Sequence, residues 1–160
     1  MFRKGSVFKV IISVSLLALF FFAPARAHAQ PIYITHVWHM HQPIYWPGED
    51  VLQTSNAGHY SFSVQTVHTD RTGPYTTWPR DAVGAARAGG LGRCGAQVSL
   101  TGSLMENLDV LEGAGAGFSG WRNPWQEAAG WRTDGGNPAL DLIGFGYFHP
   151  LMGLLWDSDI

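Results

Sequence analysis

The segment Ile32–Tyr45 reads IYITHVWHMHQPIY, and the fold expected for the rest of the chain depends on it. It begins with β-branched and aromatic residues, which are typical of a strand, and a Pro-Gly loop follows it. Side chains alternate between the two faces of a strand, so His39 and His41 share one face. Trp38 and Met40 share the other. Two imidazoles side by side at the end of a strand indicate a binding site.

Residues 1–29 have the pattern of a secretory signal peptide. A basic start is followed by an apolar run of 14 residues, Val10 to Ala23, and by the small-residue sequence Ala27-His28-Ala29. A membrane-spanning helix needs roughly 20 apolar residues. We therefore expect cleavage after Ala29 in preference to a lasting membrane anchor, and a secreted or periplasmic chain from Gln30 to Ile160.

The composition of this expected mature chain limits its ligands. The full chain has 10 basic and 12 acidic residues, and the first 29 residues hold four of the basic ones and no acid, which leaves a net charge of −6. Nucleic-acid binding needs a basic surface, so we expect no nucleic-acid partner. All seven tryptophans lie beyond residue 29, and Cys94 is the only cysteine, which excludes an internal disulfide. This composition favours an uncharged polyhydroxyl ligand over a polyanion.

Strand and helix signals alternate along the remainder of the chain. Pro79 suits a first helical position, and Ser103 with Glu106 predicts a capping box. The expected elements are an irregular stretch (43–78, with a weak helical signal at 60–68), a helix (79–88), a strand (96–100), a helix (103–113) with Leu104, Leu108 and Leu111 on one face, a short helix or loop (121–131), a turn (133–137), a strand (140–148) and a helix (150–156). This order predicts βαβ units with right-handed crossovers around a parallel sheet.

Two of the predicted strands end in histidine. His39 and His41 close the first strand, and His149 follows the third. Ligands of barrels and open α/β sheets bind at the carboxyl ends of the strands, so we expect the three imidazoles to meet there. A neutral imidazole offers one hydrogen-bond donor and one acceptor, which suits sugar hydroxyl groups.

Further ligand-binding residues are expected beside these histidines. Gln42 adds a side-chain amide, and Trp46 and Trp121 add flat apolar surface for the face of a sugar ring. Core packing is an equally good explanation for Trp121, because Trp125 lies four residues later and such a pair also marks a buried helical face.

A metal site is the alternative interpretation of the histidines. His39, His41 and His149 supply three nitrogen ligands, and a His-x-His pair at the end of a first barrel strand also begins the metal sites of amidohydrolase-type hydrolases. The additional ligands that such hydrolases take from later strands are not found here, and Gln42-Pro43 has no role in that chemistry. None of the acidic residues follows a predicted strand, so no catalytic carboxylate is assigned, and no cofactor is expected.

Three segments, in order, resemble glycoside hydrolase family 57. They are WHMHQPIY (Trp38–Tyr45), VSLTGSLMENL (Val98–Leu108) and GYFHPLMGLL (Gly146–Leu155), and the similarity runs from about Ile32 to Trp156. The first resembles the His-x-His-Gln-Pro end of the family's first strand, the second its next strand and helix, and the third its Tyr-x-His-Pro segment.

The resemblance implies the N-terminal portion of a parallel (β/α)7-type barrel, an incomplete TIM-like barrel, over residues 30–160. Members act on α-glucans or related α-linked sugars with retention of configuration, and they include amylases, α-galactosidases, glucanotransferases and branching enzymes. By position, His39 and His41 line the subsite at the scissile bond, with His149 beside them. The nucleophilic glutamate and the acid aspartate are expected beyond Ile160, so this chain alone is expected to be inactive. A catalytically silent sugar-binding protein is the alternative.

Overall fold

The computed structural model describes residues 32–150. The predicted signal peptide and the predicted helix 150–156, apart from its first residue, lie outside the described residues. The chain divides into two units between Ile34 and Thr35, and the account below concerns the unit that begins at Thr35. In residues 32–150, no helix combines the length and the apolar character that crossing a membrane requires.

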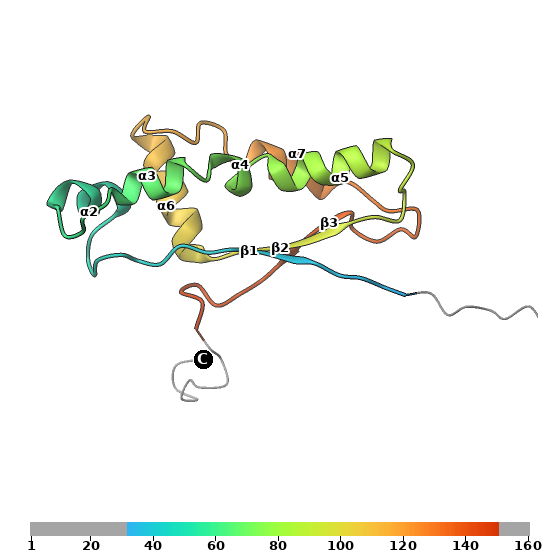
Figure 1. The fold of residues 1–160 in the computed structure, drawn as a ribbon, viewed down its shortest axis with the longest axis horizontal. Coiled ribbons are helices and arrows are strands. Elements are labelled where there is room, and N and C mark those ends of the chain that lie inside the picture. Colours follow the sequence, from blue (N-terminus) through green and yellow to red (C-terminus); the bar gives the residue numbers. More distant parts are fainter. Residues whose placement is uncertain (1–31, 151–160) are drawn as a thin grey trace, which may run out of the picture. The chain divides into compact units, whose positions relative to one another are not determined.

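Three parallel strands form one sheet in the order β1-β2-β3 (Figure 1). The strands are β1 (Val37–Met40), β2 (Ala96–Leu100) and β3 (Leu140–Ile143). In the register, His39 pairs with Ser99 and Ser99 with Ile143. Residues paired across parallel strands share a face, so these three point away from the face that carries Trp38 and Val98. The predicted mixed α/β class with a parallel sheet is confirmed.

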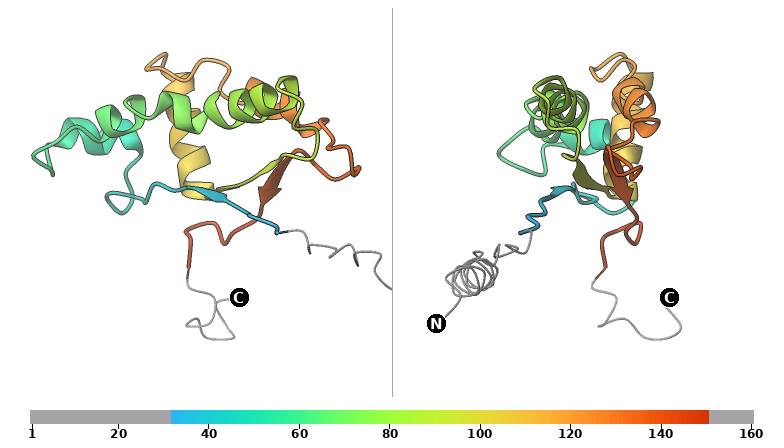
Figure 2. Two further views of the ribbon diagram at one scale, coloured as in Figure 1. Left: turned by 45° about the vertical axis from the view of Figure 1, so that its right-hand side comes forward. Right: turned by 90° about the vertical axis from the view of Figure 1, so that its right-hand side faces the viewer.

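Six helices accompany the sheet and lie on one of its faces (Figures 1 and 2). They are α2 (Val51–Ala57), α3 (Val64–Thr69), α4 (Thr72–Tyr75), α5 (Trp78–Ala88), α6 (Gly102–Gly113) and α7 (Asn123–Ala129). Trp38 and Met40 of β1 pack against the buried core on this side, whereas His39 between them is exposed. The alternation predicted for the first strand therefore separates a helix-covered face from the face that carries the histidines.

The centre of the core is the helical face predicted from the sequence. Leu104, Leu108 and Leu111 of α6 are fully buried, together with Val98 of β2. Burying one such side chain is worth about 1.5–3 kcal/mol. The predicted helix and strand that frame this core are confirmed: α5 begins one residue before its predicted start, and β2 has its predicted bounds.

The stretch 43–78, predicted to be mostly irregular, contains α2, α3 and α4, of which only α3 overlaps the weak helical signal at 60–68. The Asp50 carboxylate begins α2 by accepting hydrogen bonds from the backbone N–H groups of Leu52 and Gln53, each at 2.8 Å. The Gln53 side chain in turn accepts from the Asp50 N–H at 2.9 Å, which completes a capping box. The Ser63 hydroxyl caps α3 by accepting from the Thr66 N–H at 3.1 Å. The prediction failed because these helices have only 7, 6 and 4 residues, too few for a helical period to show.

Two predicted boundaries near the site are also wrong. Helix α6 begins at Gly102 and its N-cap is Thr101, whose hydroxyl accepts from the Leu104 N–H. The predicted capping box therefore does not form, and Ser103 instead donates to the Gln42 carbonyl at 2.6 Å. Strand β3 ends at Ile143, before its predicted end at 148, because a loop with two glycines begins at residue 144.

Candidate functional site

The structure brings His39, His41 and His149 together, and we refer to these three as the histidine cluster. The ring centroid of His149 lies 4.4 Å from that of His39 and 5.1 Å from that of His41. The His39 and His41 centroids are 6.0 Å apart, and the planes of the two rings differ by 20°. The cluster lies where β1 ends and where the loop after β3 returns to the sheet, which is the edge on which strand order predicts a site.

Two small hydroxyl side chains of β2 and its extension hold the first pair of rings. The Ser99 hydroxyl lies 2.8 Å from Nδ1 of His39, and the Thr101 hydroxyl lies 3.3 Å from Nδ1 of His41. Both hydroxyl residues are buried. Sequence reasoning missed them, although one signal was available: in V-S-L-T, two hydroxyl residues alternate as the two histidines do, and the β1–β2 register places Ser99 opposite His39.

The third imidazole is placed by an irregular loop. His149 has a φ of 56°, a left-handed conformation that side chains other than glycine rarely adopt, and its N–H donates to the Gly146 carbonyl at 2.8 Å. The Phe145 ring stacks on its imidazole, with centroids 5.1 Å apart and planes 18° apart. This phenyl ring lies 5.4 Å from the His39 ring as well, so it is an apolar neighbour of the cluster that sequence reasoning did not single out.

Tyr147 anchors this loop on the start of α6. Its ring packs so closely on Gly102 that a Cβ added there would lie 2.2 Å from Cδ2 of the tyrosine. The Tyr147 carbonyl accepts from the Ser103 N–H at 3.2 Å, and its hydroxyl donates to the Glu106 carboxylate at 3.0 Å. This hydrogen bond to Glu106 is the main reason why the pKa of Tyr147 is raised.

The surroundings of His41 favour its neutral form. Burial lowers the pKa of His41, and the neighbouring His149 and His39 lower it further because like charges repel. Within residues 32–150, the only histidine within ion-pair distance of a carboxylate is His59, 3.0 Å from Glu49. The uncharged ring of His41 suits a hydroxyl group better than a charged ligand.

Gln42, predicted to bind a ligand, lies instead in the interior. Its Nε2 donates to the Tyr75 hydroxyl at 2.6 Å, and its Oε1 accepts from the Tyr45 hydroxyl. The Tyr60 hydroxyl donates to the Tyr45 carbonyl. Burial raises the pKa of both Tyr75 and Tyr45. The amide thus connects the segment after β1 to α4, and the side chain that the sequence marked as a ligand contact holds that segment in place.

The two predicted tryptophan platforms have different surroundings. The Trp46 ring is 43% exposed and stacks on His59, with centroids 3.8 Å apart, so this imidazole covers one of its faces. Trp121 is buried in the core, and its Nε1 donates to the Asp109 carboxylate at 3.0 Å. The Arg122 guanidinium lies over the Trp121 ring at 4.5 Å. Trp121 therefore follows the core-packing alternative, and its predicted role in ligand binding is corrected.

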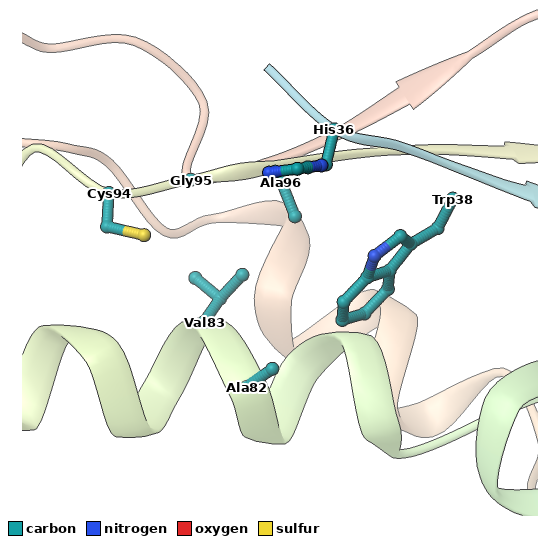
Figure 3. Close-up of a pocket in the computed structure, with 7 residues that line it drawn as sticks. All are labelled: His36, Trp38, Ala82, Val83, Cys94, Gly95 and Ala96. Atoms are coloured by element: carbon teal, nitrogen blue, oxygen red, sulfur yellow. The ribbon is translucent and has the colours of Figure 1, made fainter. Parts of the chain in front are cut away.

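Two other features were compared with the histidine cluster. Among the described residues, no group of three or more histidine, cysteine, aspartate or glutamate side chains has a geometry that could hold a metal ion. A mostly apolar cavity of about 150 Å³ lies between the helix-covered side of the sheet and α5 (Figure 3). Its lining residues are His36, Trp38, Ala82, Val83, Cys94, Gly95 and Ala96. Trp38 and His39 leave β1 on opposite faces, so this cavity is separate from the cluster.

Comparisons with known proteins add no further information to this geometry. No protein-family model, no curated protein and no solved structure matched the chain. The functional interpretation therefore depends on the residues themselves and on the three sequence segments described above.

Proposed function

We propose that this chain is the N-terminal part of an exported carbohydrate-active protein that resembles the retaining α-glycan hydrolases and transferases. The histidine cluster binds hydroxyl groups of an α-linked oligosaccharide or polysaccharide. The observation that carries the proposal is the meeting of three imidazoles at the carboxyl end of a parallel sheet, with the Phe145 ring beside them.

The arrangement of the sheet supports the barrel part of the proposal. Consecutive parallel strands pair in chain order, and the helices between them lie on one face, as in the wall of a (β/α) barrel (Figure 1). The opposite face carries polar side chains, among them Gln97, Ser99 and Asp141. In the described part of the chain the outer edges of β1 and β3 have no strand partner, so both edges can accept the further strands of a barrel.

Hydrolysis or transfer requires two carboxylates, and the histidine cluster does not supply them. Retaining glycosidases use two carboxyl groups roughly 5–5.5 Å apart. The described residues place no carboxylate within ion-pair distance of the histidine cluster. We therefore place the nucleophilic glutamate and the acid aspartate on strands beyond Ile160, and we assign the cluster to substrate positioning.

The same observation favours a second candidate, a sugar-binding protein without catalysis. Such a protein needs only the hydrogen-bonding and apolar groups that the cluster already supplies. The presence of the two catalytic carboxylates on later strands therefore separates the two candidates.

The test of sugar binding is isothermal titration calorimetry of the full chain with maltooligosaccharides. We expect binding that weakens about tenfold in His39→Ala, because losing one hydrogen bond costs about 0.5–1.5 kcal/mol. His36→Ala, on the opposite face of the same segment, is the matched control and should bind normally. No binding at millimolar sugar refutes both candidates. Sequencing beyond codon 160 separates them: strand ends that carry a glutamate and an aspartate favour the enzyme, and an open reading frame without them favours the binding protein.

A further inference from the structure

The Ser99 hydroxyl determines which nitrogen of His39 carries the proton. Ser99 is fully buried, and the only hydrogen-bond partner that residues 32–150 give to its hydroxyl is Nδ1 of His39, at 2.8 Å. A buried hydroxyl hydrogen requires an acceptor. If Nδ1 carried the proton, it would donate to the Ser99 oxygen, and the Ser99 hydrogen would be left buried without an acceptor. Nδ1 of His39 therefore accepts, and in the neutral ring the proton lies on Nε2.

Three linked hydroxyl contacts determine the opposite tautomer for His41. Ser103 has a single hydroxyl hydrogen, and it donates this to the Gln42 carbonyl at 2.6 Å. In its contact with the Thr101 hydroxyl, at 3.3 Å, Ser103 must then accept, so Thr101 uses its own hydrogen there. Thr101 has none left for Nδ1 of His41, 3.3 Å away. That nitrogen therefore donates to Thr101, and Nε2 of His41 carries no proton.

We propose that Ser99 on one side, and Thr101 with Ser103 on the other, hold His39 and His41 in opposite neutral tautomers, so that Nε2 of His39 donates and Nε2 of His41 accepts. Ser99, Thr101 and Ser103 are positioning residues in this scheme, since they act through the imidazoles. The two rings differ in plane by only 20°, and in the described residues neither Nε2 has a hydrogen-bond partner.

A donor beside an acceptor matches two hydroxyl groups of one neutral ligand, one accepting from His39 and the other donating to His41. A carboxylate has no hydrogen to donate to His41, so it satisfies only half of the pair. A metal ion cannot bind Nε2 of His39 while that nitrogen holds a proton. The ligand class depends on the proposed function, whereas the tautomers do not.

Nuclear magnetic resonance of the uniformly ¹⁵N-labelled full chain near pH 7.5 reads the tautomers directly. In each neutral ring the protonated and unprotonated nitrogens have well-separated ¹⁵N shifts, and the His39→Gln and His41→Gln spectra assign the signals. We expect a protonated Nε2 in His39 and a protonated Nδ1 in His41. The same tautomer in both rings would overturn the inference.

Ser103→Ala gives the sharper test, because it changes His41 without touching it. Thr101 then loses its acceptor and turns its hydrogen to Nδ1 of His41, so the His41 proton moves to Nε2 while His39 stays unchanged. An unchanged His41 tautomer refutes the relay. Should Ser103→Ala fail to fold, Thr101→Val replaces it: we expect mixed His41 tautomers there and a wild-type spectrum in Thr101→Ser.

Titration with maltotetraose separates this inference from the proposed function. Opposite tautomers with no sugar binding support the inference and contradict the proposed function. Sugar binding together with the same tautomer in both rings supports the proposed function and contradicts the inference. If both hold, Ser103→Ala should weaken sugar binding about tenfold, since two donors then face hydroxyls that require one donor and one acceptor.

Discussion

Replacing Gly102 by alanine should remove His149 from the histidine cluster. The new Cβ would lie 2.2 Å from Cδ2, 2.5 Å from Cε2 and 2.5 Å from Cγ of Tyr147. These atoms run along one edge of the ring from its attachment point, so a small rotation of the side chain cannot relieve the overlap. The loop that carries Tyr147 must move, and His149 lies only two residues further along it.

The expected loss of stability follows from the contacts that this movement breaks. The Ser103 N–H loses its bond to the Tyr147 carbonyl, and the Tyr147 hydroxyl loses its bond to Glu106. Each is worth about 1 kcal/mol. Alanine is favoured over glycine in a helix by at most about 1 kcal/mol, which offsets part of the loss. We expect the free energy of unfolding to fall by about 1 kcal/mol.

Urea titration measures the stability change, and nuclear Overhauser effects between the rings of His149 and His39 report on the cluster, because their centroids are 4.4 Å apart. These effects should disappear in Gly102→Ala. Gly113→Ala is the matched control at the other end of the same helix, where an added Cβ has no neighbour within 4 Å. If Gly102→Ala keeps the effects and is as stable as Gly113→Ala, the close packing of Tyr147 does not hold the loop.

Three further changes test the core and the buried polar groups. Leu108→Ala should lower the free energy of unfolding by about 2–5 kcal/mol in a urea titration, because this leucine is fully buried; a loss under about 1 kcal/mol would contradict its place in the core. Burial lowers the pKa of His68 in the folded chain, so the unfolded chain binds a proton more tightly. The contribution of neutral His68 to the free energy of unfolding should therefore be complete above pH 6.5 and should be lost as the pH falls below that value. The Asn107 amide lies 3.1 Å from Nε2 of His68, and Asn107→Asp puts a carboxylate in its place, which should weaken this loss of stability in acid. An unchanged slope of the free energy of unfolding between pH 7 and 5 would argue against His68 as the source. Gln42→Ala leaves the buried Tyr75 hydroxyl without its donor and should cost about 1–3 kcal/mol, seen as a lower thermal midpoint; an unchanged midpoint would show that the amide is not structural.

Strong periodicity made the framework predictable. The three leucines of α6 and the alternating residues of β1 are signals that span a whole element, and the structure confirms both. Helices α2 and α4 escaped prediction, and α3 gave only a weak signal, because their order depends on single caps such as Asp50 and on burial against other elements. Those contacts involve distant residues, so a local pattern does not reveal them.

The candidate site was likewise predictable only in part. Alternation alone predicts that His39 and His41 share a face, and strand order predicts that His149 lies near them. The roles of Ser99 and Thr101 come from the register between two strands about sixty residues apart, and serine and threonine are too common to attract notice by themselves. Gln42 was misjudged because its amide chemistry suits a ligand and a buried tyrosine pair equally well.

The left-handed backbone of His149 has a consequence for the evolution of this protein. A side chain other than glycine in such a conformation costs of the order of 1 kcal/mol, which glycine at the same position would recover. Selection for thermal stability alone should therefore replace this histidine early. A lineage that keeps His149 keeps the imidazole and a less stable loop. Thermostable variants that carry glycine at position 149 should therefore have lost binding of the ligand of the histidine cluster.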